Sequence, residues 1–160
     1  MPGSGKSTVG PLLAKNISRD FLDTDLVIQA SQKKRTLQDI VNTGGQAALR
    51  LIEEEVLLSL AFRNHVIATG GSAVYSEQGM IHLKADGIAV FLDTDLDTLE
   101  SRIDNFNTRG LVKRADQTFA QLFDERLPLY RKYADITINC ADLSPKKVCA
   151  RIVAELEINA

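Results

Sequence analysis

Two spacings of apolar residues alternate along the chain, one typical of helices and one of buried strands. The stretch 46–62 has helical periodicity and is expected to form a long helix. Its apolar stripe consists of Leu49, Ile52, Val56 and Leu60. The same reasoning predicts helices over 7–15, 96–103 and 119–131, shorter ones through 26–28 and 37–41, and a last helix that begins at 144–145.

Continuous apolar runs predict short strands between these helices, at 21–23, 66–69, 88–92 and 136–138. Strands that are apolar on both faces and alternate with helices indicate a parallel sheet covered on both sides, which is a three-layer α/β fold. Only the stretch 104–117 resists the pattern, because it is polar and rich in arginine, lysine and glycine. No repeat or linker divides the 160 residues, so we expect one domain over 1–160.

Composition and charge exclude several classes of protein. No apolar run approaches the roughly 20 residues that cross a bilayer, so we expect no membrane partner. Nineteen basic residues stand against 21 acidic ones, which argues against binding nucleic acid through bulk charge. The two cysteines, Cys140 and Cys149, form no metal-binding or disulfide pattern. We therefore expect a cytoplasmic monomer that acts on small molecules.

A candidate phosphate-binding loop, Gly3-Ser4-Gly5-Lys6-Ser7-Thr8, opens the first predicted helix. Glycines let the backbone curl so that successive N–H groups converge on phosphate oxygens, and the helix N-terminus adds partial positive charge. Lys6 can then reach the outer phosphates of ATP, and the hydroxyl of Ser7 can bind Mg²⁺. The alternative is a glycine-rich turn before a helix, which rarely carries this order of residues followed by an apolar helix.

The full phosphate-loop motif has one more glycine, five positions before Gly5, and a strand normally leads into it. Both features would lie before Met1. Such a strand is normally central, and its loss would leave two neighbouring strands unpaired. We therefore expect that the sequence begins inside a longer protein whose first strand lies upstream.

Two carboxylates follow the next predicted strand. Asp23 and Asp25 are two residues apart, so they point roughly the same way if the extended conformation continues. One carboxylate can hold the metal, and the other can meet a substrate hydroxyl. The alternative interpretation is an aspartate-rich cap of the helix that follows.

Further polar residues can complete a site. Arg50 and Glu53 are three residues apart on the long helix, hence on one face, although an exposed ion pair has the same spacing. Gly70-Gly71 follows a buried strand directly and would allow close approach of a ligand, although a tight turn would look the same.

Taken together, the motifs resemble shikimate kinases, from residue 2 almost to the C-terminus. Besides the phosphate loop, the matching segments are Asp23-Thr24-Asp25, Gly45-Gln46-Ala47-Ala48-Leu49-Arg50-Leu51-Ile52-Glu53, Gly70-Gly71-Ser72, Arg109-Gly110-Leu111 and Pro128-Leu129-Tyr130-Arg131. The resemblance implies a P-loop kinase fold with a five-stranded parallel sheet, a substrate-binding segment at about 26–62 and a mobile lid at about 104–117. The implied activity is transfer of the γ-phosphoryl group of ATP to the 3-hydroxyl of shikimate, on the route to chorismate and aromatic amino acids.

The resemblance also implies a role for each matching residue. The loop from Gly3 to Thr8 would hold the ATP phosphates, while Ser7 and Asp23 would bind Mg²⁺. The residues implied to contact shikimate are Asp25, Arg50, Gly70, Gly71 and Arg131. Two guanidinium groups suit one carboxylate because each can pair with it bidentately. Arg102 would lie near the adenine, and Arg109 would descend onto the phosphates, so that Lys6, Asp25 and Arg109 carry the catalysis.

This sequence departs from the family pattern at five positions. They are Val41, Gln46, Leu49, Ser72 and Gly110, of which Gln46 stands where the family has Glu. Since the charged residues implied to contact the substrates are kept, we expect a substrate that bears a carboxylate, beside an apolar wall that is less aromatic. Two alternatives remain open, a kinase for another small hydroxy acid or polyol, and a nucleotide-binding module that has lost catalysis.

Overall fold

The computed structural model describes residues 1–33, 35–103 and 117–158. The helices are α1 (Lys6–Asn16), α2 (Thr24–Ser31), α3 (Leu37–Ser59), α4 (Glu77–Ala85), α5 (Leu96–Arg102), α6 (Phe119–Tyr133) and α7 (Pro145–Ile158), with a 3-10 turn η1 (Ala73–Tyr75). The strands are β1 (Asp20–Asp23), β2 (His65–Ala68), β3 (Val90–Asp93) and β4 (Ile136–Asn139). No helix within these ranges is long and apolar enough to cross a membrane.

The predicted elements are present, with one omission and one merger. The omission is α4, whose apolar residues are too sparse to mark a clear stripe. The merger is α3, which unites the two helices predicted on either side of Gly44-Gly45. Gly45 has φ 74° and ψ 179° there, so the helix is kinked where the sequence predicted a break.

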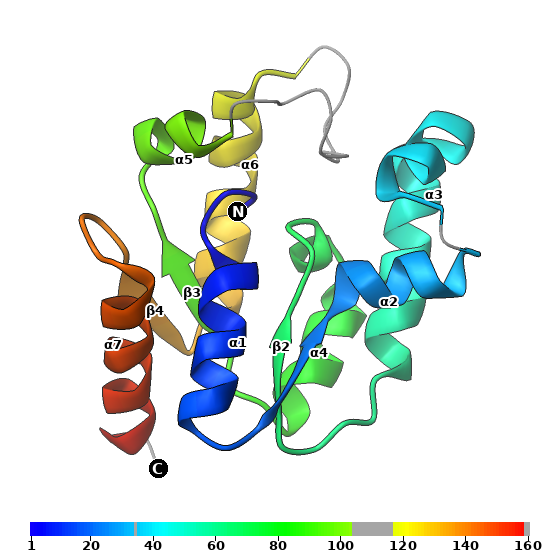
Figure 1. The fold of residues 1–160 in the computed structure, drawn as a ribbon. Coiled ribbons are helices and arrows are strands. Elements are labelled where there is room, and N and C mark those ends of the chain that lie inside the picture. The colour runs from blue at the N-terminus through cyan, green and yellow to red at the C-terminus, as the bar shows by residue number, and fades with distance from the viewer. Residues whose placement is uncertain (34, 104–116, 159–160) are drawn as a thin grey trace.

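The strands form two parallel pairs. β1 pairs with β2, and β3 pairs with β4, so β2 and β3 each keep one edge that is unpaired within the described residues. Figure 1 shows α1 crossing in front of the space between these edges. The parallel α/β class is confirmed. Four of the five expected strands are seen among the described residues.

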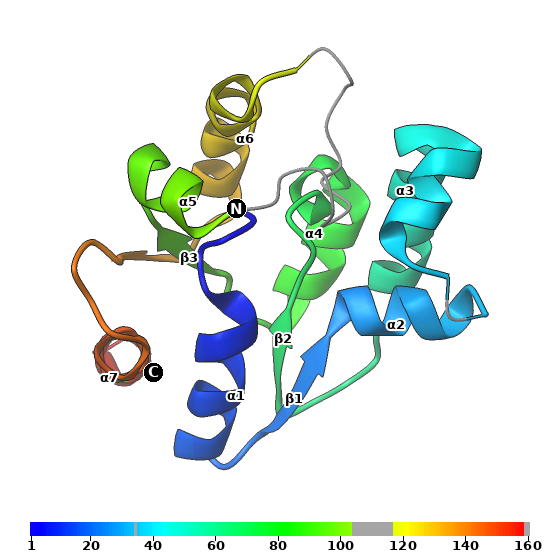
Figure 2. The same cartoon turned by 45° about the horizontal axis from the view of Figure 1, so that its top comes forward.

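Helices cover both faces of the strands. α1 and α7 lie on one face, and α4 and α6 lie on the other (Figures 1 and 2). The core of the first face is formed by Val9, Leu13, Leu92, Ile136, Ile138, Cys140, Val148, Cys149 and Ile152. A separate apolar cluster joins α2 to α3 and consists of Ile28, Ile40, Leu49 and Val56. The two helices therefore pack as a unit at the side of the sheet.

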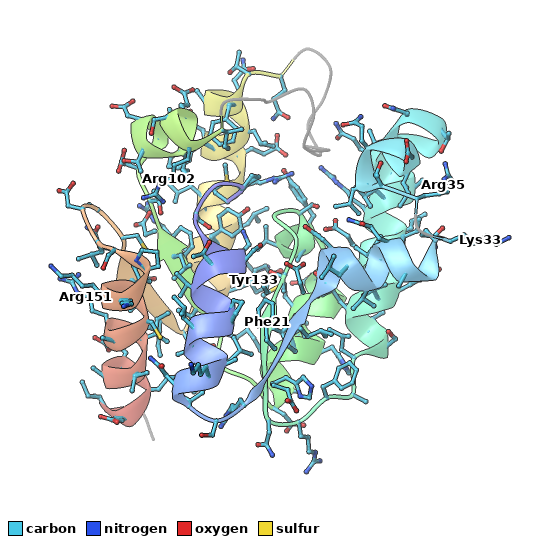
Figure 3. All side chains as sticks on the ribbon, viewed as in Figure 1. Phe21, Lys33, Arg35, Arg102, Tyr133 and Arg151 are labelled. Atoms are coloured by element: carbon cyan, nitrogen blue, oxygen red, sulfur yellow. The ribbon has the colours of Figure 1, made fainter. Side chains whose placement is uncertain are left out.

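Contact between α1 and β1 requires a small residue. A Cβ atom added at Gly10 would lie 2.4 Å from Cε2 of Phe21, whose ring is labelled in Figure 3. The phosphate loop ends at Thr8, two residues before Gly10, so the close approach of helix and strand helps to fix where the loop lies.

We predict that Gly10→Ala lowers the free energy of unfolding by about 1 kcal/mol, because overpacking costs about 1–3 kcal/mol and offsets the better helix propensity of alanine. In a Phe21→Ala background the same change should be neutral or stabilising, since the ring that it meets is absent. Denaturant unfolding of the four proteins measures this coupling. A cost for Gly10→Ala that is the same in both backgrounds would contradict the packing argument.

Candidate active site

The loop before α1 has the backbone geometry that its glycines allow. Gly3 and Gly5 have φ 78° and 91°, in the left-handed region that other residues rarely adopt. The carbonyl oxygen of Met1 accepts hydrogen bonds from Ser4 Oγ and Lys6 Nζ, both at 2.8 Å. The loop therefore curls around the first turn of α1, with its lysine folded inward.

A hydroxyl and a carboxylate meet beside this loop. Ser7 Oγ donates to Asp23 Oδ2 over 3.3 Å, which joins the two residues predicted to bind Mg²⁺. Hard oxygen ligands of this kind suit Mg²⁺, which usually keeps several waters and binds phosphate oxygens as well. Within the described ranges no cluster of three or more His, Cys, Asp or Glu side chains could hold a metal by itself. The pair thus fits a metal that arrives with a nucleotide.

Parallel pairing explains why these polar groups converge. Asp23 lies opposite Ala68 in the register of β1 and β2, so the residues that follow both strands meet at one edge. The backbone N–H of Gly70 donates to Thr24 Oγ1 at 3.0 Å, and that of Asp25 donates to Asp23 Oδ1 at 3.0 Å. The interpretation of these aspartates as a helix cap is therefore correct for Asp23, and it is compatible with a second role.

Two carboxylates crowd around Gly70. A Cβ atom there would lie 2.5 Å from Glu53 Oε1 and 2.8 Å from Asp25 Oδ1, so a larger residue would displace these two carboxylates. Asp25 Oδ1 and Glu53 Oε2 are buried and have no hydrogen-bond partner among the described residues. Such oxygens are costly to bury unless a ligand or a proton satisfies them.

Burial shifts the charge state of both groups. It raises the pKa of Asp25, and the negative charge of Asp23 adds to the rise. Burial also raises the pKa of Glu53 to about 7, against a lowering by a hydrogen bond with Ser72. Lys6 behaves in the opposite sense, because burial lowers its pKa while the nearby aspartates oppose that change. This edge of the sheet is consequently a poorly solvated place where small movements change protonation.

A buried arginine from α6 lines the cavity beside the carboxylates of Asp25 and Glu53. Arg126 is 1% exposed, lines the same cavity as Glu53, and comes within 3.0 Å of where a Cβ of Gly71 would lie. Arg131, the residue expected here, is exposed and is not among the described residues that line the cavity. Five residues along a helix turn the direction by about 140°, so both arginines cannot face the same site. The geometry therefore favours Arg126 over Arg131.

Arg50 approaches from α3. Its guanidinium carbon lies 3.8 Å from the ring centroid of Tyr75, and its Nε is buried without a hydrogen-bond partner among the described residues. Arg50 does not itself line the cavity as far as the structure describes it, but its charge helps to lower the pKa of Glu53. Arg50 therefore lies close to the carboxylate of Glu53, outside the described lining of the cavity.

Tyr130, from the Pro128–Arg131 motif, holds the turn at Gly70-Gly71 in place. The hydroxyl of Tyr130 donates to the carbonyl oxygen of Gly71 at 2.6 Å, and its ring stacks on Phe91 with centroids 5.3 Å apart. Burial raises the pKa of Tyr130 to about 12, so the hydroxyl remains a donor. Gly71 is thereby held at the cavity wall rather than in a free turn.

One cavity of about 560 Å³ joins the loop before α1 to Asp23, Asp25, Glu53 and Arg126. Its described lining comprises the loop from Pro2 to Val9, Asp23, Asp25, Leu37, Glu53, the segment Ala68–Ser72, Arg102, Ile103, Arg126, Cys140, Leu143, Pro145 and Val148. Arg102 lies beside the phosphate loop, with Nη1 3.5 Å from the carbonyl oxygen of Gly3 (Figure 3). Arg109 and Gly110, with most of the expected lid, fall in 104–116, outside the described residues.

The apolar departures lie away from this cavity. Leu49 is fully buried in the cluster between α2 and α3, and Val41 packs against that cluster. Neither is among the described residues that line the cavity. The expectation that the wall beside the substrate is less aromatic stays a prediction. Ser72 does line the cavity.

Sequence reasoning missed Arg126 and Tyr75. A signal for Arg126 was present, because it continues the buried stripe of α6 formed by Phe119, Leu122 and Tyr133. An arginine at an apolar position of an amphipathic helix indicates a buried partner. Tyr75 carried no comparable signal, since it follows a glycine turn with no regular periodicity.

A phosphate loop at the edge of a parallel sheet, with a hydroxyl–carboxylate pair and an acid-lined cavity beside it, is typical of P-loop small-molecule kinases. The shikimate kinase family model matches residues 2–157, and the chain belongs to this family.

Individual relatives agree with the family assignment. Shikimate kinases of Thermodesulfovibrio yellowstonii and Vibrio cholerae are 34% and 35% identical, each over 97% of this chain and 90% of the relative. The solved structure of shikimate kinase from Acinetobacter baumannii in complex with shikimate matches with TM-score 0.90 and 31% identity, over 99% of this chain and 89% of that one. The Aquifex aeolicus enzyme matches with TM-score 0.83 and 34% identity, over 98% and 92%.

We predict that Glu53→Gln removes a loss of stability at high pH. The pKa of Glu53 rises from 4.5 to about 7 on folding, so between these values the folded protein keeps a proton that the unfolded chain releases. The free energy of unfolding of the wild type should therefore fall more, from about pH 5 to about pH 8, than that of Glu53→Gln. Denaturant unfolding at both pH values measures the difference.

Glu55→Gln is the matched control, because Glu55 is exposed on the same helix. It should keep the pH dependence of the wild type. If Glu53→Gln keeps it as well, the burial argument for Glu53 is wrong.

Proposed function

We propose that this chain transfers the γ-phosphoryl group of ATP to the 3-hydroxyl group of shikimate. The observation that carries the proposal is that the phosphate loop and the Asp25–Glu53–Arg126 wall line the same cavity. A nucleotide-binding module alone has no use for a buried arginine and two buried carboxylates next to its phosphates. The family membership and the shikimate complex of the A. baumannii relative support the same acceptor.

At the nucleotide end, the loop from Gly3 to Thr8 binds the phosphates through its backbone N–H groups and Lys6. Ser7 and Asp23 would hold Mg²⁺, which when bound would supply positive charge to the phosphate oxygens. Arg102, beside Gly3 at the entrance, lies against the adenine. Arg109 lies outside the described residues, and its approach to the phosphates stays a prediction.

At the acceptor end, Arg50 and Arg126 bind the carboxylate of shikimate. The sequence predicted Arg131 for this role. We assign the role to Arg126 instead, because Arg126 lines the cavity, whereas Arg131 is not among the described lining residues. Gly70 and Gly71 let the ring approach the backbone closely, since side chains there would collide with Asp25, Glu53 or Arg126. The ring is thus fixed with one hydroxyl facing the phosphates.

In the reaction, the acceptor oxygen attacks the γ-phosphorus as the bond from that phosphorus to the β–γ bridging oxygen breaks. Asp25 accepts a hydrogen bond from the attacking hydroxyl and takes its proton, for which its raised pKa is suited. Lys6 stabilises the charge that develops on the transferred group. The products are ADP and a phosphate ester of shikimate. We retain the predictions that the protein acts as a monomer and in the cytoplasm.

A coupled assay of ADP release tests the function with shikimate, quinate and gluconate as acceptors. We expect turnover with shikimate, formation of a phosphate ester visible by phosphorus NMR, and little turnover with the other two. Lys6→Met should reduce kcat by about 100-fold or more, which also excludes a contaminating kinase. Turnover with quinate or gluconate but not with shikimate would favour a different acceptor. The absence of any acceptor-dependent turnover would favour a nucleotide-binding module that has lost catalysis.

A pair of variants on α6 tests which arginine binds the acid. Arg126→Lys should raise KM for shikimate by about 10-fold or more, because lysine cannot pair bidentately, and leave KM for ATP nearly unchanged. Arg131→Ala is the matched control on the same helix, and it should behave like the wild type. A larger effect from Arg131→Ala than from Arg126→Lys would restore the assignment that the sequence suggested.

A further inference from the structure

Tyr75 lies between the two arginines of the acceptor site. It ends η1, directly after the turn at Gly70-Gly71, and the backbone bond from Tyr75 N–H to the carbonyl oxygen of Ser72 at 2.9 Å fixes its position. Its side chain is half-buried. The residue has no assigned role in the phosphoryl transfer described above, and it reaches two elements that are distant in sequence, α3 and α6.

The ring of Tyr75 holds Arg50. The guanidinium carbon of Arg50 lies 3.8 Å from the ring centroid, which is a close cation–π contact. Stacking uses the flat face of the guanidinium and leaves its edge free to donate hydrogen bonds in the plane. Because Nε of Arg50 is buried without a protein partner among the described residues, this contact compensates part of its desolvation.

The hydroxyl of Tyr75 orients Arg126. Nε of Arg126 donates to that hydroxyl at 3.3 Å, and its guanidinium carbon lies 5.2 Å from the same ring. The hydroxyl in turn donates to Glu125 Oε1, while Gln117 Nε2 donates to Glu125 Oε2 at 2.7 Å. Burial and the bond to Glu125 raise the pKa of Tyr75, so the phenol remains neutral. The hydroxyl of Tyr75 therefore donates to Glu125 and accepts from Arg126, so its orientation is fixed.

We infer that Tyr75 is a positioning residue that sets the spacing and the planes of Arg50 and Arg126 for one carboxylate. The inference rests on the proposed function, because it assigns both arginines to the acid group of the acceptor. Two cations converging on one site repel each other, and a shared aromatic face with a hydroxyl at its edge attracts both. Tyr75 itself does not line the cavity among the described residues, so its effect passes through the arginines.

Two variants separate the ring from the hydroxyl. Tyr75→Leu removes both contacts, and KM for shikimate should rise about tenfold with KM for ATP unchanged. Tyr75→Phe keeps the ring beneath Arg50 and loses only the bond to Arg126, so its KM should rise about threefold. Tyr133→Phe is the matched control, since Tyr133 lies at the far end of α6 in an apolar cluster with Val74 and Met80. It should leave both constants unchanged.

The decisive measurement compares shikimate with its neutral carboxamide. If Tyr75 acts through the arginines, Tyr75→Leu lowers kcat/KM for the acid and leaves the low kcat/KM for the amide unchanged. A general structural defect would lower both values by the same factor, which would overturn the inference while leaving the proposed function intact. If the wild type does not phosphorylate shikimate at all, the proposed function fails first, and this inference fails with it.

Discussion

Mutual compensation of buried charges is the constraint on which the site depends. Asp25, Glu53 and Arg126 lie at the carboxyl edge of the β1–β2 pair, where each would be costly to bury alone. The compensation is incomplete without a ligand, because oxygens of both carboxylates lack protein partners among the described residues and the pKa of Glu53 is raised to about 7. Under the proposed function, the hydroxyls of the acceptor would donate to these oxygens, and its binding would then stabilise the site.

Local signals made the glycine-rich loop before α1 and the proximity of Ser7 and Asp23 predictable from sequence. Backbone geometry at Gly3 and Gly5 follows from the absence of a Cβ atom, and parallel strands bring their carboxyl ends together in any α/β fold. The two-residue spacing of Asp23 and Asp25 was interpreted as an extended segment, but the helix α2 begins at Thr24, so Asp23 caps the helix and Asp25 lies in its first turn. Helices with a regular stripe were equally visible, whereas α4 was missed because it lacks one.

Long-range placement was harder to predict than local structure. The segment around Pro128 was identified, but its arginine was chosen by adjacency to the motif rather than by helical face, and this selected Arg131 instead of Arg126. Tyr75 could not be found at all, because its importance comes from α3 and α6 meeting at one ring. Such a meeting depends on the packing of the whole sheet and has no signature in the nearby sequence.

The departures from the family pattern divide according to where the structure places them. Val41 and Leu49 belong to the apolar cluster that joins α2 to α3, so they affect how these two helices pack. Ser72 lines the cavity, and its hydrogen bond lowers the pKa of Glu53 against the effect of burial. A hydroxyl in this place favours the charged form of that carboxylate. Of these three departures, only Ser72 is among the described lining residues, so we expect it to affect the chemistry of the acceptor end most directly.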